Sequence, residues 1–171
     1  NPFYRDDQPA YWASRDLSTN HSPEQYIAAD ESTRIAFADV LPVLTPDAAF
    51  LEIGCNAGRN LAYLYDRGFR NLAGIEINRV AVAETLPRHF PELARTARFF
   101  VGDAAVEAGK LPAAAYDVVF SIAVLIHIPP AARRLFADMV RISRKYIVVI
   151  TAENGQPYPY DFDRIFTGLG C

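Results

Sequence analysis

Short apolar runs alternate with longer amphipathic stretches over most of this chain. Five of the runs are brief and rich in β-branched and aromatic residues, and several are apolar on both faces, as buried parallel strands are. The five runs are Phe50–Ile53, Leu72–Glu76, Arg98–Val101, Tyr116–Phe120 and Tyr146–Ile150. Because such strands need cover on both faces, the pattern predicts a mostly parallel sheet between two layers of helices.

The stretches between these runs carry helical spacing. We expect helices over Arg59–Arg67, Arg79–His89, Pro130–Ile142 and Tyr160–Leu169. Gly68 suits the position after the first of them, while Pro87 and Pro91 should break the second. Strands and helices that alternate with short connections predict a three-layer α/β sandwich with right-handed crossovers.

The first 47 residues precede this alternation. Ser22-Pro23-Glu24-Gln25 is typical of a helix start, with the serine as N-cap and the glutamine reaching back to it. We expect residues 1–47 to form a helical strap on a core of residues 48–171, in one domain. The aromatic residues upstream, which include Trp12, suit either packing on the domain or a lid over a ligand.

The composition excludes several classes of protein. The 171 residues are 51% hydrophobic and 22% charged, which is typical of one globular domain and not of a disordered or fibrous chain. A net charge of −3 gives no basic field for nucleic acid or an anionic membrane. Two cysteines cannot build a disulfide framework, and no apolar run reaches a membrane-spanning length. We expect a cytoplasmic protein with no membrane contact and no metal.

The most informative stretch is Gly54-Cys55-Asn56-Ala57-Gly58, which follows a predicted strand and opens a predicted helix. Glycine suits a loop that turns sharply and approaches a ligand closely. The spacing differs from the dinucleotide fingerprint, and Glu52 just before the loop would repel a pyrophosphate. A carboxylate there suits a cationic ligand instead, such as S-adenosylmethionine, which has an ammonium and a sulfonium group and no phosphate.

The ends of the following strands extend this pattern. Glu76 ends the second strand, where a carboxylate can accept both hydroxyl groups of a ribose. Asp103 follows the third strand and is placed to accept the amino group of adenine. The fourth strand, which includes Asp117, would face the methionine half of the cofactor with its carboxyl end. Each residue alone is typical of a cap or a surface charge, but their order along the chain indicates one cofactor site.

With these motifs the sequence resembles the class I S-adenosylmethionine-dependent methyltransferases of the small-molecule type, over about Ala48–Ile150. The first motif of that family is acidic-x-Gly-x-Gly-x-Gly, and here Asn56 replaces the middle glycine, which a left-handed backbone tolerates. The resemblance implies a Rossmann-like fold. It also implies a cofactor site of Glu52, Gly54, Cys55, Asn56, Ala57, Gly58, Asn60, Glu76, Ile77, Asp103, Ala104, Ser121 and Ile122. For Asn60, a place on the helix surface is the alternative.

The resemblance implies methyl transfer to an oxygen or nitrogen of a small molecule. A sulfonium is an activated methyl donor, so orientation of the acceptor matters most, and a general base is optional. His127, after the fourth strand, is the candidate base, and closing the loop before Pro129 is its structural alternative. The candidate substrate-binding residues are Trp12, Tyr26, His127 and Tyr158. The Asn/Asp-Pro-Pro-aromatic signature of enzymes that methylate nucleic acids is missing, which disfavours nucleic acid as a partner.

Two other functions stay open on the sequence. One is a non-catalytic domain that binds S-adenosylmethionine or serves as a scaffold, and the other is a nicotinamide-dependent oxidoreductase. The family usually has seven strands, and the pattern here predicts five, so we expect strands six and seven to be absent. The fifth strand would then be an edge that needs cover from the strap, from missing sequence or from a second copy in a homodimer.

Overall fold

One parallel sheet forms the centre of the molecule, in a computed structural model that describes residues 7–16, 18–28, 31–151 and 157–171. The strand order is β3-β2-β1-β4-β5, and all neighbouring strands are parallel. The strands of this described part are β1 (Ala49–Ile53), β2 (Asn71–Glu76), β3 (Arg98–Val101), β4 (Tyr116–Ile122) and β5 (Ser143–Ile150). The expected α/β sheet is confirmed, although β5 begins at Ser143 rather than Tyr146.

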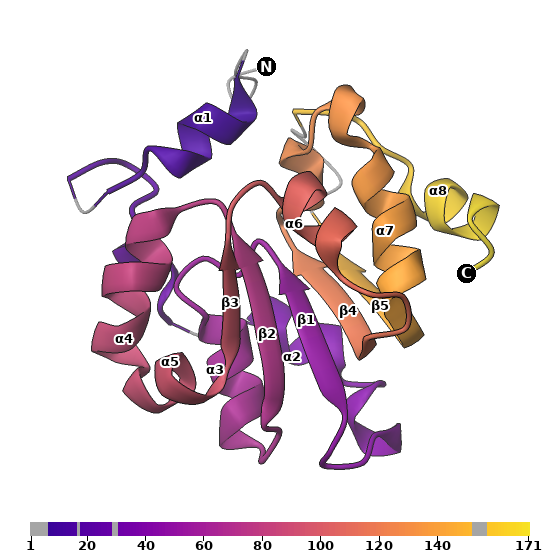
Figure 1. The fold of residues 1–171 in the computed structure, drawn as a ribbon, viewed down its shortest axis with the longest axis horizontal. Helices are drawn as coiled ribbons and strands as arrows, with labels where there is room; N and C mark the ends of the chain where they lie inside the picture. The colour runs from indigo at the N-terminus through magenta and orange to yellow at the C-terminus, as the bar shows by residue number, and fades with distance from the viewer. Residues whose placement is uncertain (1–6, 17, 29–30, 152–156) are drawn as a thin grey trace.

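Side chains alternate between the two faces of β1, and this alternation separates the layers. Phe50 packs in one core with α2 (Glu31–Phe37), α3 (Arg59–Asp66), α4 (Leu86–His89) and α5 (Pro91–Thr96). Leu51 and Ile53 pack in the other core with α6 (Ala104–Lys110), α7 (Arg134–Ile142) and α8 (Phe162–Gly168). Figure 1 shows α6 and α7 on the opposite side of the sheet from α2 and α3. The three layers expected from the sequence are therefore present.

The second expected helix spans Arg79–His89 as predicted, but Pro87 does not break it, and the helix expected from Pro130 starts differently. In the second, the chain forms a π-helical turn at Ala81–Thr85 and then α4, so Pro87 lies inside the helical segment instead of breaking it. The widened turn tolerates a residue that cannot donate a backbone hydrogen bond. The expected helix at Pro130 begins with a 3-10 turn, Pro130–Ala132, and becomes α-helical only at Arg134.

The N-terminal helix starts at a different place from the one expected. Ser22 begins only a 3-10 turn, Pro23–Tyr26, and its side chain makes no capping hydrogen bond. Helix α1 (Gln8–Ala13) lies upstream and starts at Asp7, whose carboxylate accepts the Ala10 N–H at 3.0 Å. An aspartate followed by Gln-Pro is a helix-start signal, so α1 could have been predicted. A second 3-10 turn at Leu41–Val43 precedes β1.

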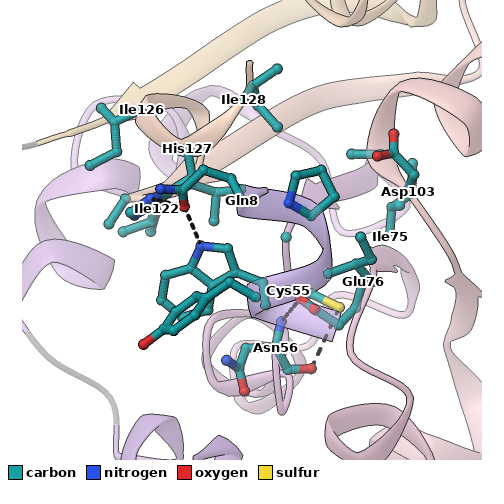
Figure 2. Close-up of a pocket in the computed structure, with 18 of the residues that line it drawn as sticks. Gln8, Cys55, Asn56, Ile75, Glu76, Asp103, Ile122, Ile126, His127 and Ile128 are labelled. Atoms are coloured by element: carbon teal, nitrogen blue, oxygen red, sulfur yellow. Dashed lines mark hydrogen bonds between the residues drawn. The ribbon is translucent and has the colours of Figure 1, made fainter. Parts of the chain in front are cut away.

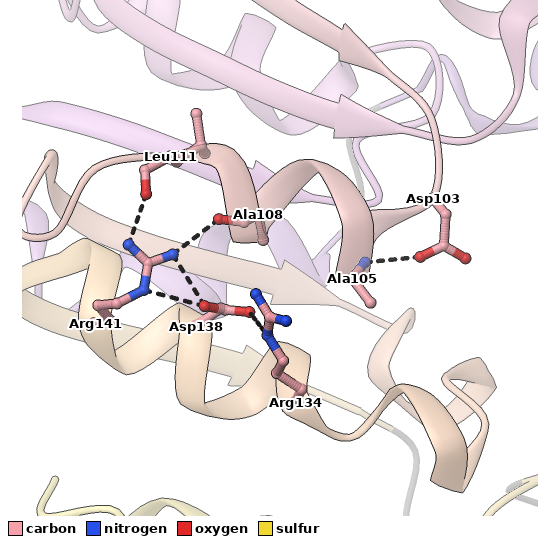
Figure 3. Close-up of polar contacts among 7 residues, drawn as sticks. All are labelled: Asp103, Ala105, Ala108, Leu111, Arg134, Asp138 and Arg141. Carbon is pink, nitrogen blue, oxygen red and sulfur yellow. Dashed lines mark hydrogen bonds and ion pairs between the residues drawn. The ribbon is translucent and has the colours of Figure 1, made fainter.

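A buried carboxylate fixes α7 against α6. Asp138 accepts hydrogen bonds from Arg141, whose guanidinium also donates to the carbonyl oxygens of Ala108 and Leu111 at 3.0 and 2.6 Å (Figure 3). These carbonyls lie at the end of α6, where carbonyl oxygens lack their usual helical partners, and the Ala108 oxygen also accepts the Leu111 N–H at 3.1 Å. The contact therefore caps α6 and holds the helix that begins just after β3.

Asp117 lies at the amino end of β4, away from the expected cofactor site. Its carboxylate accepts the Ala49 N–H at 2.9 Å and pairs with Arg144 and Lys145. Burial acts to raise the pKa of Asp117, but the hydrogen bonds from these groups prevail and lower it to about 2. Asp117 thus ties the start of β4 to β1 and β5. Since β5 is an edge of the sheet, the homodimer that would cover it stays a prediction.

Candidate functional site

A cavity of about 490 Å³ lies at the carboxyl ends of β1 to β4. The strand order reverses between β1 and β4, which is where ligands bind in open α/β sheets. The volume lies in the range of small-molecule sites. Helix α1 and the segment after β4 form the opposite wall, and Figure 2 shows Gln8 and His127 there, with Glu76 and Asp103 across the cavity.

The loop after β1 forms the floor of the cavity. Gly54, Asn56 and Gly58 have φ angles of 75°, 47° and 82°, all in the left-handed region. Asparagine is among the few non-glycine residues that adopt it readily. A Cβ atom on Gly54 would lie 2.5 Å from Cγ2 of Val124, so a larger residue would push the loop away from the segment after β4. Glycine therefore allows these two walls to meet.

Glu76 presents a buried carboxylate to this cavity. Its side chain is 7% exposed, and its Oε2 and Oε1 accept the backbone N–H groups of Asn56 and Asn78, each at 2.7 Å. Burial raises the pKa of Glu76, and the backbone N–H groups offset part of that effect. The backbone N–H of Ile77 also acts on this carboxylate. A carboxylate has about four acceptor positions, so capacity is left for a hydroxyl group of a ligand.

Glu52 lies behind the cavity wall instead of in it. Its Oε1 accepts a hydrogen bond from Nδ2 of Asn60 at 2.6 Å. Oδ1 of Asn60 in turn accepts a hydrogen bond from the Thr33 hydroxyl at 2.6 Å. Oε2 of Glu52 is buried and has no hydrogen-bond partner among the described residues. Burial raises the pKa of Glu52 to about 8. At neutral pH Glu52 is therefore mostly protonated, and Asn60 separates it from the cavity.

Asp103 caps α6 and also lines the cavity. Its Oδ1 accepts the Ala105 N–H at 2.8 Å, which holds the carboxylate at the start of the helix. Oδ2 is not used by this cap, and it is half-buried with the rest of the side chain. Asp103 is thus held by the helix it caps while one oxygen stays available as an acceptor.

His127 ends a 3-10 turn, Leu125–His127, after β4. The ring lines the cavity and packs edge to face on Trp12, with the ring centroids 5.0 Å apart. Burial, with a smaller contribution from the nearby His21, lowers the pKa of His127 to about 4. The imidazole is therefore neutral at physiological pH and has one nitrogen able to accept a proton.

Comparison with known proteins identifies the family. A family model described as a methyltransferase domain matches residues 50–145, more than half of the chain. The chain belongs to the methyltransferase domain family. The resemblance to class I S-adenosylmethionine-dependent methyltransferases seen in the sequence is thereby confirmed. A search of curated proteins found no match.

Solved structures with the methyltransferase fold resemble the chain at low sequence identity. Magnesium protoporphyrin IX methyltransferase (ChlM) from Synechocystis PCC 6803, with bound S-adenosylmethionine, has a TM-score of 0.72 at 19% identity, over 97% of this chain and 87% of that one. A TehB-like S-adenosylmethionine-dependent methyltransferase from Corynebacterium glutamicum has a TM-score of 0.64 at 20% identity, over 81% and 71%. The (4+2)-cyclase SpnF has a TM-score of 0.59 at 20% identity, and the chain spans 49% of its length. These similarities show the fold. Because a cyclase shares this fold, the reaction has to be inferred from the residues of the site.

The structure brings most of the predicted methyltransferase site together. The predicted cofactor residues that line the cavity are Gly54, Cys55, Asn56, Asn60, Glu76, Ile77, Asp103, Ala104 and Ile122. Four others, Glu52, Ala57, Gly58 and Ser121, are buried outside the lining. The alternative place for Asn60 on the helix surface is wrong, because that side chain is 5% exposed between Glu52 and Thr33.

Of the predicted substrate residues, three line the cavity. Trp12, Tyr26 and His127 do so, from three separate segments of the chain. Tyr158 does not line it: its backbone N–H donates to the Ile126 carbonyl, and Pro157 takes the position at the wall. The ring of Tyr158 lies beside that of Tyr160, with the ring centroids 6.2 Å apart.

Several lining residues escaped the sequence analysis. Gln8 and His21 line the wall formed by the N-terminal segment, and His21 bonds at 2.8 Å to the hydroxyl of Tyr11, one of the upstream aromatic residues considered for a lid. The start signal of α1 at Asp7 could have placed Gln8 on a helix, but nothing local indicates that the helix covers a cavity. The described residues contain no group of three metal-ligating side chains, and no helix among them has the length and apolarity to cross a membrane.

Proposed function

We propose that this chain binds S-adenosylmethionine in the cavity and transfers its methyl group to an oxygen or nitrogen of a small molecule. The observation that carries the proposal is the Glu76 carboxylate, which is held by backbone N–H groups, lines the cavity and keeps acceptor capacity for a ligand. Membership of the methyltransferase domain family supports this ligand over a nicotinamide dinucleotide. The same match favours an enzyme over a scaffold.

The lining residues include a suitable partner for each part of the cofactor. Glu76 would accept the ribose hydroxyls, Asp103 the adenine amino group, and the loop from Gly54 to Asn56 would face the amino-acid part. When bound, S-adenosylmethionine supplies a methyl carbon whose bond to a positively charged sulfur breaks with its electron pair on the sulfur. The acceptor end is then the wall formed by Trp12 and His127.

His127 is the candidate base for an acceptor that carries a proton. The acceptor would give its proton to the neutral imidazole and bond to the methyl carbon with the freed electron pair. The low pKa of His127 keeps the ring unprotonated over the physiological range. Its packing on Trp12 fixes the plane of the ring.

The N-terminal segment is proposed as a lid over this site, in the same domain as the Rossmann-like core. Glu24 anchors the turn that carries Tyr26, because its two oxygens bind Arg88 at 2.8 Å and His89 at 2.6 Å. The aromatic side chains of the lid, Trp12 among them, cover the acceptor side and would exclude water during the transfer.

His127→Ala should lower the rate of methyl transfer about 10²- to 10⁴-fold, because the acceptor loses its base, while cofactor affinity stays unchanged. The assay uses methyl-labelled S-adenosylmethionine with a panel of phenols, carboxylic acids and amines. His89→Gln is the matched control, since it keeps a donor toward Glu24 and lies outside the cavity lining. A His127→Ala protein as active as the control would remove the imidazole from the mechanism. Absence of transfer to every acceptor, with cofactor bound, would favour the non-catalytic binding domain.

A further inference from the structure

Gln8, the first residue of α1, joins two aromatic side chains of the cavity wall. The residue is 2% exposed. Its Oε1 accepts a hydrogen bond from Nε1 of Trp12 at 3.2 Å, and the same oxygen lies 3.2 Å from Nδ1 of His127. Figure 2 shows the Gln8 side chain beside that of His127. A buried amide therefore connects the N-terminal helix to the candidate base.

The contact with the Trp12 indole determines which atom of the Gln8 amide faces the His127 imidazole. An indole N–H can only donate, so the Gln8 atom that it contacts must be the carbonyl oxygen. An amide oxygen can only accept, so Nδ1 of His127 must carry the proton in this contact. Because a neutral imidazole has one N–H, Nε2 is left with the lone pair.

We propose that Gln8 is a positioning residue that holds His127 in the tautomer protonated on Nδ1, so that Nε2 is the atom that takes the proton of the methyl acceptor. This inference rests on the proposed function only for the use of Nε2. The tautomer itself is a property of the protein without ligands. The base is complete only when α1 is docked on the cavity.

The docking of α1 depends on the cofactor side of the cavity. Nδ2 of Asn78 donates to the carbonyl oxygens of Trp12 at 3.2 Å and Arg15 at 2.7 Å. The backbone N–H of the same residue donates to Oε1 of Glu76. One buried residue therefore contacts both the carboxylate assigned to the ribose and the helix that carries Gln8.

The charges around His127 define how its protonation should respond to a change at Gln8. The titratable and charged groups on the surrounding segments are His21, Tyr11 and Tyr26 of the N-terminal segment, Arg59 at the start of α3, Tyr158 after β5, and Glu76 and Asp103 across the cavity. His21 packs on Trp12 with ring centroids 5.6 Å apart, and its repulsion adds to burial in lowering the pKa of His127. A carboxylate in place of the Gln8 amide would put a negative charge in direct contact with Nδ1.

Nitrogen NMR of the histidine side chains tests the tautomer without cofactor or acceptor. In the wild type near neutral pH, we expect His127 to show a protonated Nδ1 and an unprotonated Nε2. Gln8→Leu should lose this preference. Gln8→Glu should keep it, because a carboxylate also accepts from both rings, and should raise the pKa of His127 by about 1–3 pH units. The acid limb of the pH–rate profile should move upward with it.

A protonated Nε2 in the wild type, or an unchanged tautomer in Gln8→Leu, would overturn the assignment. Trp12→Phe is a second variant that keeps an aromatic ring but removes the indole donor, so the amide can turn and a mixture of tautomers is expected. An unchanged tautomer there contradicts the argument from the indole. Titration of the wild type with S-adenosylhomocysteine separates the tautomer proposal from the proposed function. A protein with the expected tautomer that does not bind this ligand contradicts only the proposed function. A protein that binds the ligand but has the other tautomer contradicts only the role of Gln8.

Discussion

Glu76→Ala should weaken the binding of S-adenosylhomocysteine about 10- to 150-fold, which corresponds to roughly 1.5–3 kcal/mol for hydrogen bonds to a charged acceptor. The carboxylate is buried and held by the N–H groups of Asn56 and Asn78, so its remaining acceptor capacity is fixed in place before the ligand arrives. Removal of the side chain would take away the proposed contact to the ribose. Isothermal titration calorimetry measures the change directly.

The loss should be specific to the cavity. Glu84→Ala is the matched control, because Glu84 is an exposed glutamate on the π-helical turn and does not line the cavity. Glu76→Gln should bind more tightly than Glu76→Ala, since an amide keeps one acceptor. A thermal melt establishes that each variant is folded. Equal affinity in the wild type and a folded Glu76→Ala would mean that the ribose lies elsewhere.

The free energy of unfolding of the wild type should fall as the pH rises, because Glu52 is buried. Glu52→Gln should abolish this contribution to the fall. The pKa of Glu52 is about 8 in the folded protein, above its usual value of 4.5. The folded state therefore keeps a proton that the unfolded state loses, so rising pH favours unfolding between these two values. The expected loss across this window is on the order of 3–5 kcal/mol. Glutamine cannot ionise, and its oxygen can still accept from Asn60.

Urea denaturation near the two ends of this window, at pH 5 and pH 8, measures the effect. The difference in unfolding free energy between the two conditions should shrink in Glu52→Gln, and the variant should be the more stable protein at the higher pH. Glu84→Gln, which changes an exposed glutamate, should keep the wild-type difference. A Glu52→Gln protein with the wild-type pH dependence would place the titrating group elsewhere.

The sheet and most of the cavity floor could be predicted from the sequence because both depend on local patterns. Buried parallel strands are short apolar runs, and their carboxyl ends meet at one edge. Polar residues that end or follow the strands, such as Glu76 and Asp103, therefore come together. The left-handed backbone of Asn56 follows from its residue type in a glycine-rich turn.

The rest depended on contacts between distant segments. Glu52 was expected to face a cationic ligand, but Asn60 and Thr33 form a buried chain of hydrogen bonds with it that no local pattern indicates. Tyr158 was expected at the acceptor site, and a backbone contact to Ile126 directs it elsewhere. The wall formed by α1 is fixed by Asn78, far away in the sequence.

The most direct test of the account is calorimetric titration of the wild-type protein with S-adenosylhomocysteine and, separately, with NAD. We expect saturable binding of S-adenosylhomocysteine with one site per chain and no binding of NAD at the same concentrations. Preference for NAD, or no binding of S-adenosylhomocysteine to the folded protein, would contradict the assignment of this cavity.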